Sequence, residues 1–198
     1  MSNQGLVYVF TGDGKGKTSA ALGIVLRSLT HGWKVGWVSW YKEASWGISE
    51  HKLDTILNED AKKRLFFFPM GKGFYLREGT EFQNNNVKTV CANSAVIIDD
   101  DSVNSHRIAA SNALKKAENL LSTVDILVLD EVCNAIRDGL VDEKEVLYVL
   151  EKRKSTHLVL TGRNATKTII QKADLVSEIK KIKHPFDDGK MAIKGLDF

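Results

Sequence analysis

A short apolar run followed at once by a glycine-rich, lysine-containing segment constrains the fold of this chain more than any other feature. Residues 6–10, Leu-Val-Tyr-Val-Phe, have the continuous apolar character of a strand buried on both faces of a parallel sheet. Residues 11–18 then read Thr-Gly-Asp-Gly-Lys-Gly-Lys-Thr, and residues 17–29 place apolar side chains near helical spacing. Strand, glycine loop and helix in this order form the context in which a Walker A pattern predicts phosphate binding.

This loop is predicted to bind the phosphates of MgATP. Glycines leave backbone N–H groups free to point at anionic oxygens, and the following helix N-terminus adds partial positive charge. Lys17 is predicted to contact the outer phosphates, and Thr18 carries the hydroxyl that binds Mg²⁺ in such loops. Thr11 stands where the usual pattern has its first glycine, which indicates a distinct subgroup. The residues predicted to form the cradle are Thr11, Gly12, Asp13, Gly14, Lys15, Gly16, Lys17, Thr18 and Ser19.

A second motif, a pair of acidic residues, follows the apolar run at residues 126–129. Asp130 and Glu131 end this run, and carboxylates at the C-terminal end of a parallel strand face the ligand crevice. Read alone, such a pair is more often a helix N-cap. Together with the phosphate loop, it indicates a Walker B strand whose acids help to hold magnesium.

Strand and helix patterns alternate along the rest of the chain. Because parallel strands need long crossovers, this alternation predicts an α/β fold with a doubly wound, mostly parallel sheet flanked by helices, of the P-loop NTPase (RecA-like) kind. We expect one domain over residues 1–198 and regard the polar segment 84–101 as a candidate for a mobile or inserted piece. Strands are predicted at 35–40, 64–68, 95–98, 125–130 and 157–161, helices at 50–58, 102–122, 142–151 and 166–171, an extended segment at 175–182, and an irregular tail at 183–198.

Charge and cysteine content exclude several functional classes. The net charge of +3 arises from 28 basic and 25 acidic residues, a balance that predicts neither a nucleic-acid partner nor a membrane surface. No stretch has the length of a signal h-region or a transmembrane helix. Cys91 and Cys133 have no metal or redox spacing and are expected to be reduced thiols. These features predict a cytoplasmic protein.

The phosphate loop does not by itself name a reaction, because several reactions start from the same cradle. Further motifs follow it in an order that resembles the P-loop ATP:corrinoid (cob(I)alamin) adenosyltransferases. The likeness runs from about residue 5 to residue 198 and is weakest over 84–110, from which nothing is carried over. Besides residues 11–18, it rests on Ala20-Ala21-Leu22-Gly23, Arg27, His31-Gly32, Gly71-Lys72-Gly73-Phe74, Leu129-Asp130-Glu131, Thr161-Gly162-Arg163, Ala173-Asp174 and residues 183–187, Lys-His-Pro-Phe-Asp.

This resemblance implies transfer of the 5′-deoxyadenosyl group of ATP to the cobalt of a reduced corrinoid, with triphosphate leaving in one piece. Co(I) is itself a strong nucleophile, so the protein needs no general base and mainly stabilises the leaving group. Lys15, Lys17 and Mg²⁺ are expected to do this. The resemblance also implies a homodimer and a flavoprotein reductant that generates Co(I).

Three polar residues are expected at the nucleotide. The family position that matches Arg27 packs at the adenine, although an exposed helix arginine is the commoner fate. Arg163 is expected to face the crevice at a strand end rather than to be a surface charge in a turn. His184 either approaches the nucleotide or caps the terminal segment.

The corrinoid side of the site is expected to be apolar, because removing an axial ligand makes reduction of Co(II) easier. The resemblance assigns this role to Phe74 and to a second aromatic two residues later, where this chain has Leu76. Leu76 or the intervening Tyr75 is expected to take over the second position, unless residues 74–76 form a core strand. The chain has four tryptophans, Trp33, Trp37, Trp40 and Trp46, and packing is the simplest explanation for most of them.

Two other functions remain open at this point. A small-molecule kinase or another P-loop NTPase would need an acceptor site and a base or water-positioning group, and no such residues are identified. A non-catalytic, nucleotide-dependent corrinoid-binding module would fit the missing second aromatic. The intact lysines and carboxylates argue against that module.

Overall fold

The computed structural model of the chain describes residues 4–75, 83–84, 87–92, 95–99 and 101–197, and of residues 83–99 only the backbone. Its centre is a six-stranded sheet in which every neighbouring pair is parallel. This confirms the predicted α/β, P-loop NTPase-like fold. The spatial order of the strands is β3 (Leu65–Pro69), β2 (Val35–Ser39), β7 (Ile126–Asp130), β8 (His157–Thr161), β1 (Val7–Thr11) and β9 (Leu175–Glu178).

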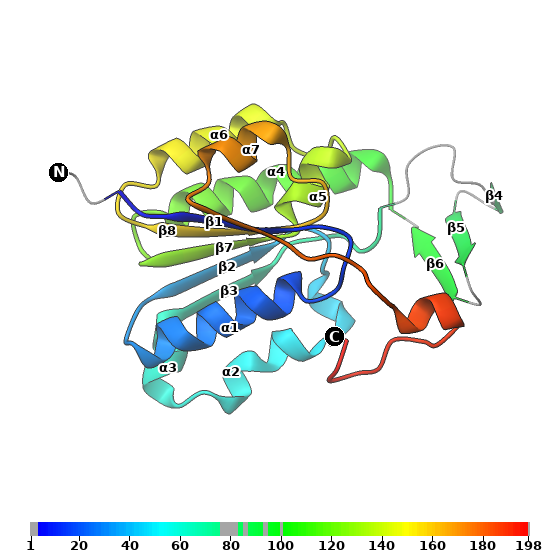
Figure 1. Cartoon of the computed structure of the whole chain (residues 1–198), viewed down its shortest axis with the longest axis horizontal. Coiled ribbons are helices and arrows are strands. Elements are labelled where there is room, and N and C mark those ends of the chain that lie inside the picture. The colour runs from blue at the N-terminus through cyan, green and yellow to red at the C-terminus, as the bar shows by residue number, and fades with distance from the viewer. Residues whose placement is uncertain (1–3, 76–82, 85–86, 93–94, 100, 198) are drawn as a thin grey trace.

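Helices cover both faces of this sheet, as Figure 1 shows. One face carries α4 (Val103–Leu120), α5 (Val132–Arg137), α6 (Glu143–Lys152) and α7 (Lys167–Lys172). The opposite face carries α1 (Lys17–Thr30), α2 (Leu53–Ile56) and α3 (Glu59–Arg64). No helix of the described residues is long and apolar enough to cross a lipid bilayer.

The central strand β7 shows why the core has two halves. Successive side chains of a strand point to opposite faces, so an apolar run feeds both layers. Leu127 and Leu129 lie in the core beneath α4 and α6, whereas Ile126 and Val128 lie in the core beneath α1. All four side chains are buried, which explains why this run contains no polar residue before its end.

Side chains cap the starts of three helices that the sequence predicted. The Ser102 hydroxyl accepts the Ser105 N–H at the start of α4, and Asp142 forms a capping box with Glu145 at the start of α6. The Thr166 hydroxyl accepts the Ile169 N–H at the start of α7. The helices predicted at 102–122, 142–151 and 166–171 are therefore confirmed to within two residues.

The predicted single helix at 50–58 is wrong. A 3₁₀ turn (Ser49–Lys52) leads into the short α2, and Leu57 then adopts an extended conformation. Asn58 caps a new helix, α3, because its side chain accepts the Ala61 N–H at 2.8 Å. The sequence analysis also missed α5, which begins directly after Glu131.

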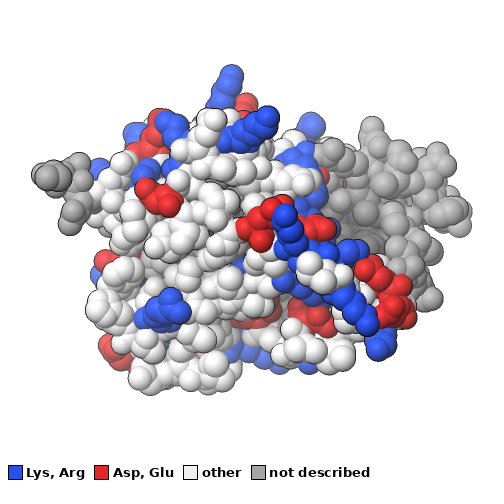
Figure 2. All heavy atoms as spheres, in the orientation of Figure 1, with Lys and Arg blue, Asp and Glu red and all other residues white. Residues whose placement is uncertain are grey.

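The strand predicted at 95–98 exists but lies outside the main sheet. It is β6 (Ala95–Asp99), which pairs antiparallel with β5 (Val87–Ala92), and β5 pairs with β4 (Gln83–Asn84). These strands form the separate three-stranded sheet at the right of Figure 1. The predicted irregular tail contains a 3₁₀ turn, η3 (Pro185–Asp188). Lys and Arg side chains gather over the segment between β9 and this turn (Figure 2).

Leucine truncations in the sheet test the two-layer core. Leu127→Ala is expected to lower the free energy of unfolding by about 2–5 kcal/mol, because it leaves a cavity beside a fully buried strand. The matched change Leu175→Ala, on the edge strand β9 where the side chain is 37% exposed, is expected to cost less than about 1 kcal/mol. Urea unfolding followed by tryptophan fluorescence measures both. Equal losses would contradict the assignment of β7 to the centre and β9 to the edge.

Candidate functional site

The site lies where the carboxyl ends of four adjacent strands meet. The sheet order places β2, β7, β8 and β1 side by side, so the segments that follow these strands share one edge. These segments line a cavity of about 630 Å³. Its walls contain the phosphate loop, the end of β7 with Glu131, the turn after β8, and aromatic residues from the segments that follow β2 and β3.

Positive φ angles and close backbone contacts explain the glycines of the loop. Gly12 has φ 103°, and a Cβ atom there would lie 2.4 Å from the backbone oxygen of Ile179. The Gly14 N–H donates to this same oxygen at 2.8 Å, so the segment after β9 supports the loop from behind. Gly16, with φ 113°, then turns the chain into α1. The result is a loop whose shape only glycine permits at these positions.

Thr11 shows why this chain tolerates a residue other than glycine at the first position of the pattern. It is the last residue of β1, it is buried, and its φ is not positive. The Thr11 hydroxyl accepts the Ala165 N–H at 3.1 Å, which ties the loop to the segment that follows β8. The departure from the usual pattern therefore adds a contact between two neighbouring strand ends.

Lys17 lies against its own loop. Its ammonium donates to the carbonyl oxygens of Gly12 at 2.9 Å and Gly14 at 2.6 Å. Burial, and after it the nearby positive charge of Arg163, lower the pKa of Lys17. An anion in the cavity would offset both effects, so the electrostatics of the loop favour a phosphate group.

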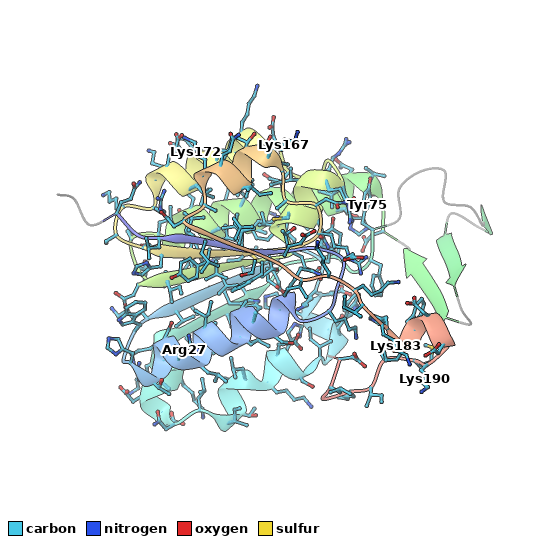
Figure 3. All side chains as sticks on the ribbon, viewed as in Figure 1. Arg27, Tyr75, Lys167, Lys172, Lys183 and Lys190 are labelled. Atoms are coloured by element: carbon cyan, nitrogen blue, oxygen red, sulfur yellow. The ribbon has the colours of Figure 1, made fainter. Side chains whose placement is uncertain are left out.

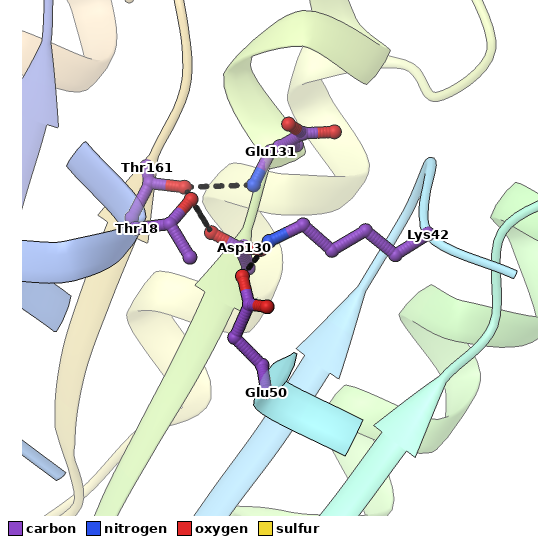
Figure 4. Close-up of polar contacts among 6 residues, drawn as sticks. All are labelled: Thr18, Lys42, Glu50, Asp130, Glu131 and Thr161. Atoms are coloured by element: carbon purple, nitrogen blue, oxygen red, sulfur yellow. Dashed lines mark hydrogen bonds and ion pairs between the residues drawn. The ribbon is translucent and has the colours of Figure 1, made fainter. Parts of the chain in front are cut away.

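The carboxylate of Asp130, at the end of β7, contacts one residue from each of the other three strand ends (Figure 4). Its Oδ1 accepts hydrogen bonds from the hydroxyls of Thr18 at 3.1 Å and Thr161 at 2.8 Å. Its Oδ2 accepts the ammonium of Lys42 at 2.8 Å. The Thr161 hydroxyl also accepts the Glu131 N–H at 2.8 Å. Asp130 is fully buried, so these contacts compensate the cost of placing a charge in the interior.

Lys42 and Glu50 are site residues that the sequence analysis missed. Lys42 follows β2, and its ammonium also lies 3.2 Å from the Glu50 carboxylate. Burial alone would lower the pKa of Lys42, but the carboxylates of Asp130, Glu131 and Glu50 together more than offset this and raise it, so the side chain is charged. The sequence offered one signal for Lys42, since it comes shortly after the predicted strand at 35–40. No sequence pattern pointed to Glu50, because it lies in a 3₁₀ turn within the segment that was predicted as a single helix.

Glu131 has an unusual backbone and a perturbed carboxyl group. It adopts φ 65°, a left-handed conformation that is uncommon for a residue other than glycine and often marks a functional position. Burial, and then the neighbouring Asp130 carboxylate, raise the pKa of Glu131 to about 7. Its side chain also lines the cavity, so a cation there would favour the ionised form.

The oxygen atoms around Asp130 fit a magnesium ion that arrives with phosphate. Thr18 supplies a hydroxyl, Asp130 and Glu131 supply carboxylates, and Glu50 has a buried Oε2 that accepts no hydrogen bond from the described residues. Within the described part of the chain, no three His, Cys, Asp or Glu side chains form a metal-binding group by themselves. Mg²⁺ is usually held by one or two protein oxygens together with phosphate and water, so this set is sufficient for it.

Aromatic side chains line part of the same cavity and form what we call its aromatic wall. Phe74 is 49% exposed, and its ring lies 4.9 Å from that of Trp46. Tyr75 is half-buried and contacts His106 edge-on at 5.1 Å. Residues 74 and 75 belong to no strand, so the alternative of a core strand is wrong for them, and Leu76 lies outside the described residues. Trp46 lines the cavity, a role that the sequence analysis did not assign to it.

The structure brings two further predicted residues to the phosphate loop. Arg163 is exposed at the end of β8 and lines the cavity, and its N–H donates to the Asn134 side chain at 2.6 Å. Lys15 also lines it and forms an ion pair with Asp197 near the C-terminus. Both side chains face the space in which a phosphate chain would lie.

His184 has the structural contact that was one of its two predicted roles. Its Nδ1 accepts the Phe186 N–H at 3.1 Å, which caps η3. It also lines a neighbouring cavity of about 500 Å³ together with Asp13 and Lys15. The cap is therefore confirmed, and the contact of His184 with a nucleotide stays a prediction.

Arg27 is not brought to this cavity. It lies in the last turn of α1, at the end of the helix remote from the phosphate loop (Figure 3). There it lines a separate, mostly apolar cavity of about 720 Å³, together with Tyr8, Phe10 and Trp33. Its predicted contact with adenine has no geometric support in the described structure and stays a prediction.

Removal of one hydroxyl tests the network around Asp130. Thr161→Val keeps the shape of the side chain but removes the donor to Asp130 and the acceptor for the Glu131 N–H, so it is expected to destabilise the protein by roughly 1–3 kcal/mol. The control Thr30→Val removes an exposed hydroxyl that donates to the Arg27 carbonyl and is expected to cost at most about 0.5 kcal/mol. Chemical unfolding measures both variants. A Thr161→Val variant as stable as the wild type would contradict the role of this network.

Known proteins match both the fold and the whole sequence. The flagellar accessory protein FlaH from Methanocaldococcus jannaschii superposes with a TM-score of 0.52 at 12% identity, over 90% of this chain and 72% of that one, which concerns the fold alone. A corrinoid adenosyltransferase from Pseudomonas aeruginosa is 33% identical over 98% of this chain and 84% of its own length. The Escherichia coli K12 corrinoid adenosyltransferase is 31% identical over 98% of this chain and 86% of its own length.

The family model described as ATP:corrinoid adenosyltransferase BtuR/CobO/CobP matches residues 3–198. That match spans the phosphate loop, the Walker B carboxylates and the aromatic wall, which are the features that define the cavity. This chain belongs to the ATP:corrinoid adenosyltransferase family.

Proposed function

We propose that this protein transfers the 5′-deoxyadenosyl group of ATP to the Co(I) of a reduced corrinoid and releases triphosphate. One observation supports the proposal: a single cavity is lined both by the phosphate-loop lysines and by the exposed aromatic Phe74. A polar nucleotide and a large flat apolar acceptor need a site that offers both kinds of group. Family membership supports the same reaction.

The proposed step moves one electron pair and needs no protein base. The lone pair of Co(I) attacks C5′ of ATP, the Co–C bond forms, and the C5′–O bond breaks with its electrons leaving on the triphosphate. The oxygen that was bound to C5′ therefore gains negative charge. Donors already aimed at such a leaving group lower the barrier more than groups that must first reorganise. In this proposal Lys15, Lys17 and the N–H groups at the uncapped start of α1 do this.

Magnesium is part of the proposal. Thr18, Asp130 and Glu131 are the residues that would hold it, with Glu50 beside them. When bound, Mg²⁺ adds positive charge next to the phosphates and so favours departure of the triphosphate. The hydroxyl of Thr18 already points at Asp130, so the protein oxygens are arranged before the nucleotide arrives.

The remaining expectations concern the surroundings of the enzyme. We propose that residues 1–198 act as one domain, that the chain works as a homodimer in the cytoplasm, and that a flavoprotein supplies the electron that generates Co(I). A buried, free Cys133 thiol agrees with a reducing compartment. Analytical ultracentrifugation and a reconstituted assay with a reduced flavoprotein test the last two points.

Substitution of the loop lysine tests the reaction. Under anaerobic conditions and dim light, wild-type protein with MgATP and chemically reduced cobalamin is expected to form adenosylcobalamin. The change in absorbance measures its formation. Lys17→Ala is expected to slow this by at least ~100-fold, because it removes one donor to the leaving group. The control Lys34→Ala changes an exposed lysine at the amino end of β2 and is expected to leave the rate unchanged. ADP or phosphate formed without cobalt alkylation would indicate a kinase or NTPase instead, and binding without turnover a non-catalytic module.

The aromatic wall has a separate test. If Phe74 keeps axial donors away from cobalt, its loss should hinder reduction of Co(II) more than attack by Co(I). Phe74→Ala is therefore expected to slow product formation roughly tenfold or more when the assay starts from Co(II) and a reductant, and about twofold or less when it starts from Co(I). Tyr148→Ala on α6, an exposed aromatic outside the cavity, is the control. Equal losses from both starting states would contradict this role of Phe74.

A further inference from the structure

The site already contains a cation beside the carboxylates that are expected to face a metal. The Lys42 ammonium lies 2.8 Å from Asp130 Oδ2 and 3.2 Å from Glu50 Oε1 (Figure 4). Asp130 is fully buried, and the side chains of Lys42 and Glu50 are 13% and 10% exposed. Burying two carboxylates close together is costly without a nearby positive charge. Lys42 supplies that charge.

We propose that Lys42 is the counter-ion of Asp130 and Glu50 in the nucleotide-free site, and that it is exchanged for Mg²⁺ when the metal enters with the triphosphate. After the exchange, the ammonium turns toward the phosphate oxygens. This inference rests on the proposed use of magnesium and assigns to Lys42 a positioning role that the family likeness did not supply.

The free oxygen atoms favour an exchange over simple addition of a metal. Oδ1 of Asp130 accepts two hydroxyl groups, from Thr18 and Thr161, so Oδ2 is the oxygen that an incoming cation or its water must use. That oxygen carries the Lys42 ammonium. The nearby Oε2 of Glu50 is buried and accepts no hydrogen bond within the part of the chain that the structure describes. A dication entering between these oxygens would meet the ammonium at close range, and the like charges would drive Lys42 away.

The Lys42 ammonium has an alternative position near the phosphate loop. It lines the same cavity as Lys15 and Lys17, and its four-carbon side chain lets the ammonium move while the backbone stays in place. Pairing with a triphosphate would restore the favourable contact that Lys42 loses at Asp130. The two carboxylates would then hold the metal side of the ligand, while three lysines face its phosphates.

Binding of a metal ion alone tests this exchange. Mn²⁺, which replaces Mg²⁺ and is visible by electron paramagnetic resonance, is titrated into nucleotide-free protein. Lys42→Met removes the competing charge and keeps the apolar stem, so it is expected to bind Mn²⁺ at least ~10-fold more tightly than the wild type. The control Lys62→Met breaks an exposed ion pair with Glu59 on α3 and is expected to leave the affinity unchanged. Added Mg²⁺ should displace the bound Mn²⁺.

Three further variants make the result decisive. Lys42→Arg keeps a positive charge and should bind Mn²⁺ as weakly as the wild type. In Lys42→Met/Asp130→Asn the gain should disappear, because the exchanged carboxylate is gone. Lys42→Gln replaces the methionine variant if that variant does not fold, and folding of either neutral variant only in the presence of divalent metal also supports the exchange. Equal Mn²⁺ affinity in the wild type and the neutral variants, or a gain that survives Asp130→Asn, overturns it.

The outcome can be separated from that of the proposed function. The titration contains neither ATP nor corrinoid, so it reports only on the charges around Asp130. Cobalt alkylation by the wild type, measured with and without magnesium, reports on the reaction. A wild type that forms no adenosylcobalamin would overturn the function and leave the exchange standing, whereas magnesium-dependent alkylation together with equal Mn²⁺ affinities would overturn the exchange alone.

Discussion

The buried carboxylate of Asp130 is the group on which the geometry of the site depends. It accepts hydrogen bonds from Thr18 on α1 and Thr161 at the end of β8, and it pairs with Lys42 after β2. A buried carboxylate is costly unless donors or a cation satisfy its oxygens, so the fold as well as the site needs partners at this position. One side chain thus fixes the relative positions of the phosphate-loop helix and two neighbouring strand ends.

The topology of the sheet makes this connection possible. Parallel strands direct all their carboxyl ends to one edge, and the order β2, β7, β8, β1 places the four contributing segments next to one another. Close backbone packing sets the details. Gly12 lets the loop approach the segment after β9, and Gly162 (φ 137°) lets the turn after β8 approach α5, where a Cβ atom would lie 2.8 Å from Cys133 Cβ. The cavity is therefore a product of backbone geometry that the polar side chains then complete.

The sequence was sufficient for the parts of the site that are contiguous in the chain. The phosphate loop and the pair Asp130–Glu131 each follow a strand whose apolar run is unmistakable, and the structure places both where they were expected. Glu50 and Trp46 were missed because they come from short 3₁₀ turns with no clear period. Lys42 was missed because it lies in the irregular segment just after β2 and reaches Asp130 only through the tertiary fold. The sheet order and the antiparallel placement of β6 were equally beyond a pattern read along one chain, since both depend on long-range pairing.

The central claim is that the site supports attack on C5′ and stabilises triphosphate as the leaving group, rather than attack on phosphorus. Phosphorus NMR of the complete reaction tests this most directly, because it distinguishes free tripolyphosphate from ADP, AMP, pyrophosphate and phosphate in one spectrum. The account predicts that ATP stays intact until Co(I) corrinoid is added, and that tripolyphosphate then appears in proportion to adenosylcobalamin. Appearance of ADP and phosphate, with or without the corrinoid, would contradict it and return the site to the phosphoryl-transfer class.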